Sequence, residues 1–195
     1  AVDRSEARNI SVYPPSGEVR FAVLDFYNRT TAFDESPAGF IGSNDWAWGA
    51  PGGTSPHAHS GLRCWATVLS GNYTQGPRLS SLTMPLSLVV SSRPSFSFWQ
   101  WYEVQSRYDG GNVKISVNHG PFQLIQPVGG YPPPVIYNGF GNPLGGQAGY
   151  SSVGGTAWSK ATFDLTGLAT EGDSIAIRFD FGADNSIQYR GWYID

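Results

Sequence analysis

The side chains of this 195-residue chain that could carry out chemistry are few and scattered. His57 and His59 lie two positions apart in "HAH", which places both on one side of an extended segment. No third ligand stands at a spacing typical of zinc sites, so we expect no zinc there. The one cysteine, Cys64, lies in the apolar stretch "GLRCWATVLSG", where we expect a small buried hydrophobic side chain.

Known catalytic motifs are missing from the sequence. It has no G-x-S-x-G, no H-E-x-x-H and no glycine-rich phosphate loop. Carboxylate pairs such as Asp180 and Asp184 could serve a glycosidase, but such pairs normally line a deep cleft, which a small sandwich lacks. We therefore expect a protein that is not an enzyme.

Aromatic residues occur in two long segments rich in Gly and Pro, residues 42–61 and 127–156. Loops longer than about 12–15 residues are usually functional or disordered, and the second segment reads as an ordered loop wrapped over a sheet face. Flat aromatic rings beside Asn, Gln and Ser suit the stacking of sugar rings, so carbohydrate is a possible partner. For the two tryptophans, packing over the end of the sandwich is the alternative. The candidate ligand-binding residues are Trp46, Trp48, Tyr131 and Tyr137.

The composition is that of an extracellular β protein rich in turns. Charged residues make up 14%, aromatic residues another 14%, and the chain has 25 Gly and 14 Pro. The net charge is −3 without any run of Lys or Arg, which argues against nucleic acid as a partner. The longest apolar runs, such as "LSLVV", are too short to span a membrane. A start at Ala1 rather than Met indicates a processed or trimmed terminus, in agreement with secretion.

Apolar and polar residues alternate with period two along most of the chain. In "GEVRFAVLDFY", residues 17–27, this pattern predicts a half-buried strand. About eight to ten short strands separated by Gly, Pro, Asn and Asp predict an all-β fold, an antiparallel two-sheet jelly-roll sandwich with long Gly/Pro-rich loops and an extra N-terminal strand segment. The further predicted strands cover residues 63–71, 86–92, 94–104, 111–120, 121–128, 160–167, 173–182 and 188–195.

Two short stretches predict hairpin turns, and a set of aromatic residues predicts the core. "YDGG", residues 108–111, contains Asp-Gly, a strong hairpin signal because both turn positions need positive φ; "NHGPF", residues 118–122, repeats the device one strand later. The aromatic residues expected to point inward between the sheets are Trp65, Phe98, Tyr102, Phe163, Phe179, Phe181 and Trp192.

Several ordered stretches carry a family resemblance. They include "AFDES", "WAWGAP", "HSGLRCWATVLSGNY", "LSSLTMPLSL", "KATFDLTGLA" and the closing "IRFDFGADNSIQYRGWYID". With these, residues 33–195 resemble the MAM-like jelly-roll module of secreted prokaryotic proteins, found beside immune-inhibitor-A-type metallopeptidases. The resemblance implies one domain over residues 33–195, preceded by an N-terminal extension over residues 1–32.

The same resemblance implies a structural calcium ion. The matching acidic positions are Asp34 or Glu35 in "AFDES" and Asp195 in "GWYID". Where the family usually reads "YIDD", this chain has only the first Asp, so we expect the sequence to stop within one or two residues of a natural last strand. Further candidate acidic ligands are Asp45, Asp109 and Asp184, although each of them fits an Asx-type turn better than a calcium site.

The N-terminal extension suggests an assembly role. An apolar strand behind Pro14 and Pro15 is suited to complete the sheet edge of a neighbouring copy, which would permit self-association into a filament. The alternative is an extra strand in the chain's own sandwich. The glycosylation sequons lie at Asn9, Asn28 and Asn72.

Together these observations predict a non-catalytic module, located outside the cell or at its surface, with a structural or adhesive role. Assembly through the N-terminal segment would fit that role. The alternative function is that of a carbohydrate-binding or accessory domain of a secreted hydrolase or metallopeptidase.

Overall fold

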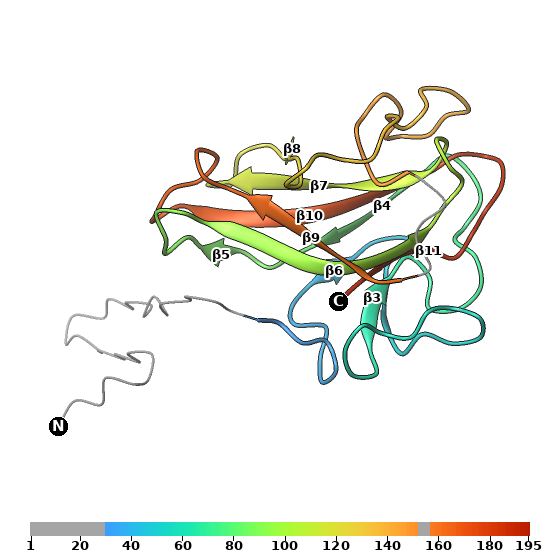
Figure 1. Cartoon of the computed structure of the whole chain (residues 1–195), viewed down its shortest axis with the longest axis horizontal. Coiled ribbons are helices and arrows are strands. Elements are labelled where there is room, and N and C mark those ends of the chain that lie inside the picture. The colour runs from blue at the N-terminus through green and yellow to red at the C-terminus, as the bar shows by residue number, and fades with distance from the viewer. Residues whose placement is uncertain (1–29, 152–156) are drawn as a thin grey trace.

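The computed structural model describes residues 30–151 and 157–195, which form a sandwich of two antiparallel sheets lying one above the other (Figure 1). The predicted all-β, two-sheet architecture is confirmed. Within these two ranges there is no helix, and hence no helix that could cross a membrane. The predicted strand over residues 17–27, with the sequons at Asn9 and Asn28, lies outside the described residues, so assembly through it stays a prediction.

The first sheet is built around its longest strand, β10 (Ser174–Ala183). Its order is β1 (Ile41–Gly42), β4 (Arg78–Thr83), β10, β7 (Gly110–Val117) and β8 (Gln123–Leu124). The short strand β5 (Ser87–Leu88) pairs with the beginning of β10.

The second sheet has the order β2 (Ala47–Gly49), β3 (Cys64–Ala66), β11 (Gly191–Ile194), β6 (Ser95–Glu103) and β9 (Ser159–Asp164). The chain crosses repeatedly between the two sheets, because β6, β9 and β11 alternate with β7 and β10 of the first sheet (Figure 1).

Alternation along the strands sends one aromatic set into the space between the sheets. The seven aromatic residues expected to point inward all belong to or pack against the main core cluster, as predicted. Trp192 is 1% exposed and contacts the rings of Phe98 and Phe179, so it joins the two sheets. Tyr193, the next residue, points to the opposite face and packs in a second cluster against Cys64 and Trp101.

The hairpin predicted at "YDGG" is wrong. It connects β6 to β7, which belong to different sheets. The glycines serve close packing instead of a turn: a Cβ on Gly111 would lie 2.4 Å from the Trp192 ring. Asp109 points inward, where its carboxylate accepts hydrogen bonds from Tyr73 and from the amide of Asp184. Asp109 is therefore a buried hydrogen-bond acceptor with partners far away in the sequence, and not a residue of a hairpin turn.

The hairpin predicted at "NHGPF" is confirmed. β7 and β8 pair antiparallel, and both Asn118 and His119 have positive φ, 49° and 61°. Three strands, β1, β2 and β4, were not predicted: β1 begins just before residues 42–61 and β2 lies within them, both too short to show a period-two pattern. "RLSSLT" in β4 has few strand-forming residues, and its pairing with β10 makes it a strand.

Candidate functional site

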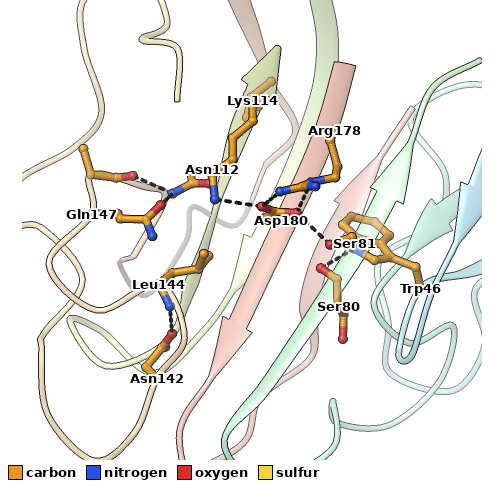
Figure 2. A network of polar contacts seen from close by, with 12 residues as sticks. Trp46, Ser80, Ser81, Asn112, Lys114, Asn142, Leu144, Gln147, Arg178 and Asp180 are labelled. Carbon is orange, nitrogen blue, oxygen red and sulfur yellow. Dashed lines mark hydrogen bonds and ion pairs between the residues drawn. The ribbon is translucent and has the colours of Figure 1, made fainter. Parts of the chain in front are cut away.

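The candidate site lies at the end of the sandwich where the Gly/Pro-rich loop and the segment after β10 meet (Figure 1). Over its described part, residues 127–151, the loop is ordered, as predicted, and Asn142 holds it. Its buried side-chain amide donates to the carbonyl of Tyr108 at 2.6 Å and to that of Gly182 at 3.0 Å. Asn112 on β7 donates to Gln147 and to the carbonyl of Ala148, which keeps the loop on the outer face of the first sheet (Figure 2).

Three aromatic rings form a partly exposed patch, here called the aromatic platform: Tyr137 and Phe140 come from this loop, and Tyr108 comes from the segment just before β7. Tyr137 is 44% exposed and Phe140 is 67% exposed. Their ring centroids lie 6.0 Å apart, and each ring also contacts Tyr108, at 5.5 and 5.9 Å. The amide of Tyr137 donates to the carbonyl of Arg107, so the platform is held by the backbone as well as by ring contacts.

Two buried carboxylates, here called the acidic pair, lie at the ends of paired strands: Asp109, between Tyr108 and β7, and Asp184, just after β10. They are 1% and 2% exposed. The Asp109 carboxylate accepts a hydrogen bond from the Tyr73 hydroxyl at 2.6 Å and another from the Asp184 amide at 2.6 Å. Burial, opposed by these two hydrogen bonds and assisted by the charge of Asp184, raises the pKa of Asp109 to about 6.

Asp184 is only half satisfied. Its Oδ1 accepts the amide and the hydroxyl of Ser186 at 2.8 and 2.6 Å. Its Oδ2 is buried and has no hydrogen-bond partner. Across the described part of the chain, no group of three or more His, Cys, Asp or Glu side chains is close enough to hold a metal. Any ion at this end would therefore need hydroxyl, amide or carbonyl oxygens in addition to the two carboxylates.

A third buried carboxylate, Asp180, lies on the outer face of the first sheet and is fully engaged (Figure 2). Arg178 binds both of its oxygens at 2.8 and 2.9 Å, Lys114 binds Oδ2 at 2.8 Å, and the Ser81 hydroxyl donates at 2.7 Å. Burial alone would raise the pKa of Asp180, but these donors outweigh it and the pKa is lowered. The Asp180 network, these four residues, joins β4, β7 and β10.

The residues that the resemblance assigned to calcium meet at a different loop. Asp34 accepts the amides of Leu62 and Arg63, at 2.6 and 3.1 Å, and these bonds lower its pKa. Asp195 accepts the amide of Ser60 at 2.7 Å. Both aspartates thus cap neighbouring residues of one segment, while Glu35 is exposed. Calcium binding by Asp34, Glu35 and Asp195 stays a prediction.

Of the four aromatic residues predicted to bind a ligand, Tyr137 alone is substantially exposed. Trp46 is 5% exposed and donates to the carbonyl of Ser80, so its ring lies in the core. Trp48 donates to the carbonyl of Phe33 and packs against the core. The Tyr131 hydroxyl accepts a hydrogen bond from the Val113 amide, and its ring packs edge to face against the Tyr150 ring.

Sequence reasoning did not assign Tyr108 or Phe140 to ligand binding. The signal available was the position of Phe140 between Gly139 and Gly141, where a large apolar residue on a glycine-rich turn has little chance of burial. Of the remaining candidates, Asn72 is exposed and its amide donates to the carbonyl of Gln188. Cys64 is buried as predicted; burial, with the charge of Asp195, raises its pKa to about 12.

Comparison with known proteins gives one distant relative. No protein-family model matches the chain. It is 27% identical over 166 residues to Bacillopeptidase F of Bacillus subtilis (strain 168), a match that covers 84% of this chain and 10% of that protein. The chain therefore spans about a tenth of the length of the curated relative it matches. The resemblance to MAM-like modules stays a prediction.

Two solved structures are also similar in part, both of an exo-beta-1,3-galactanase from Phanerochaete chrysosporium with beta-1,3-galactotriose. One is 15% identical, with a TM-score of 0.30, and the match covers 81% of this chain and 30% of that chain. The other is 12% identical, with a TM-score of 0.25, and covers 82% and 30%.

Proposed function

We propose that this chain is a non-catalytic accessory module of a larger extracellular protein, and that its aromatic platform docks the protein on carbohydrate. The observation that carries the proposal is that Tyr137 and Phe140 are the two aromatic residues among the exposed large hydrophobic residues of the described ranges, and that their rings lie next to each other. The match to one segment of a much longer peptidase supports the accessory role.

The platform has the physical properties that sugar binding needs. Exposed aromatic rings supply flat apolar area at a low entropy cost, because a ring has only two side-chain torsions to order. Tyr108 contacts both rings, and Asn142 ties the loop to the backbone of Tyr108 and to β10 at Gly182. A surface already ordered before binding loses less freedom when the ligand arrives. The exposed amide of Asn138 lies between the two rings in sequence and can supply a polar contact.

Absence of catalysis is part of the proposal and has its own support. The lone pairs of Asp180 that could act on a substrate are engaged by two cations and a hydroxyl. The pKa of Cys64, raised to about 12, leaves its thiol protonated and weakly nucleophilic at neutral pH.

Binding to a panel of insoluble polysaccharides tests the proposal: the chain is mixed with galactan, xylan, cellulose, chitin or bacterial cell wall, and the bound fraction is measured. We expect saturable binding to at least one of them, and at least tenfold weaker binding by the double variant Tyr137→Ala and Phe140→Ala. Leu168→Ala, at a residue 44% exposed on another loop, is the matched control and should bind like the wild type. Binding to none of the five, or equal binding by the double variant, would refute the docking role.

A further inference from the structure

Within residues 30–151 and 157–195, neither of the two buried carboxylates of the acidic pair forms an ion pair with a positively charged side chain. We propose that Asp109 and Asp184 form a binding site for one calcium ion, distinct from the loop that Asp34 and Asp195 cap. The side chains are 1% and 2% exposed, and Oδ2 of Asp184 has no hydrogen-bond partner. An unpartnered oxygen on a carboxylate that is nearly fully buried is the observation that points to a missing ligand.

Buried charges in proteins are normally paired or coordinated to a metal. None of the ion pairs formed within residues 30–151 and 157–195 involves Asp109 or Asp184. Tyr73 and the Asp184 amide supply hydrogen bonds to Asp109, but both donors are neutral. A bound cation would supply the charge that the neighbouring side chains do not.

The donor atoms at this place are oxygens. Ser186 links Asp184 to Gln105, since its hydroxyl lies 2.6 Å from Oδ1 of Asp184 and 2.7 Å from Oε1 of Gln105. The Tyr73 hydroxyl adds another oxygen on the side of Asp109. Carboxylate, hydroxyl and amide oxygens without nitrogen or sulfur suit a hard cation, and calcium accepts six to eight of them in irregular geometry. Water and loop carbonyls would complete the shell.

The place in the fold gives the ion a structural role. Asp109 immediately precedes β7 and Asp184 immediately follows β10, and these two strands pair along their length. An ion between the two residues would close this end of the sheet. It would also stiffen the base of the aromatic platform, because Tyr108 adjoins Asp109 in the chain.

Calcium binding by the whole chain, stripped of metal beforehand, tests the proposal. We expect one ion per chain by isothermal titration calorimetry, luminescence from bound terbium excited through Tyr73, and a rise of several degrees in Tm with calcium relative to chelator. Asp184→Asn should weaken binding at least tenfold. In chelator, the same variant should melt at or above the wild-type temperature, because it removes an unpaired buried charge. That second result shows that the variant folds.

Asp34→Asn and Asp195→Asn are the matched controls and should keep the wild-type response to calcium. The site is overturned if the wild type shows no calorimetric signal and no change in Tm with calcium. It is equally overturned if Asp184→Asn keeps the response while the control variants lose it, which would place the ion at the other loop. Polysaccharide binding measured in chelator separates this result from the docking role.

Discussion

The Asp180 network and the acidic pair both contain buried carboxylates, but they differ in the partners of those carboxylates: Asp180 has two cationic partners, and Oδ2 of Asp184 has no hydrogen-bond partner. Asp180 and Asp184 are both within 2% of complete burial and lie four residues apart in the sequence. Asp180 sits mid-strand, where Arg178 on its own strand and Lys114 on the neighbouring one point to the same face. Asp184 follows the end of that strand, where the groups that donate hydrogen bonds to its carboxylate, the amide and hydroxyl of Ser186, are neutral. In a regular sheet, the strand register places charged side chains of neighbouring strands on the same face, where they can pair. An irregular connection has no register to bring such a partner close.

The largest expected loss of stability comes from disrupting the Asp180 network, in which the carboxylate has both ion-pair and hydrogen-bond partners. Asp180→Asn leaves the positive charges of Lys114 and Arg178 next to each other and mostly shielded from solvent. Removing one partner of a buried ion pair typically costs 3–5 kcal/mol. Because Arg178 and Lys114 keep some solvent contact, we expect a loss of about 3 kcal/mol in the free energy of unfolding, at the lower end of that range. Urea denaturation at pH 7 measures it, with exposed Glu171→Gln as the control. A loss below about 0.5 kcal/mol would mean that the network contributes little.

A smaller effect is expected at the acidic pair. Tyr73→Phe removes the hydroxyl that donates to Asp109, and hydrogen bonds to charged groups contribute about 1.5–3 kcal/mol. Tyr193→Phe removes a hydroxyl that bonds the neutral Ser55, and such bonds contribute about 0.5–1.5 kcal/mol. Denaturation of both variants in chelator should therefore rank Tyr73→Phe as the more destabilised. The opposite order would contradict a charge-assisted hydrogen bond from Tyr73 to Asp109.

The smallest effect is a pH dependence that separates the Asp180 network from the rest of the molecule. A carboxyl whose folded pKa is lowered stabilises the fold above its unfolded pKa, about 3.9, and this contribution is lost as pH falls through the folded value. The stability difference between wild type and Asp180→Asn should stay constant from pH 7 to about 5 and shrink only below about pH 4. Urea denaturation at a series of pH values measures it. A difference that shrinks well above pH 5 would contradict the lowered pKa.

Sequence reasoning found the site residue whose exposure depends on nearby residues and missed those whose positions depend on partners far away in the chain. Tyr137 could be predicted, because a tyrosine in a long glycine-rich loop is often exposed. Trp46 occupies the same kind of loop yet is 5% exposed, since Gly42 allows the chain to pack closely there: a Cβ on Gly42 would lie 2.9 Å from the Cβ of Trp46 and 2.8 Å from the Trp65 ring. Asp109 resembled a turn residue because its real partners, Tyr73 and Asp184, lie 36 and 75 positions away.

By itself the sequence determined the all-β sandwich, the aromatic core and the turn at Asn118 and His119. Period-two alternation and positive φ depend on nearby residues, so they can be read along the chain. Tertiary structure alone decided that "YDGG" crosses between sheets, that Asp180 meets two cations, and that Asp109 and Asp184 meet without one. These outcomes depend on which strands pair and where each strand ends, and hydrogen bonds between distant residues set both.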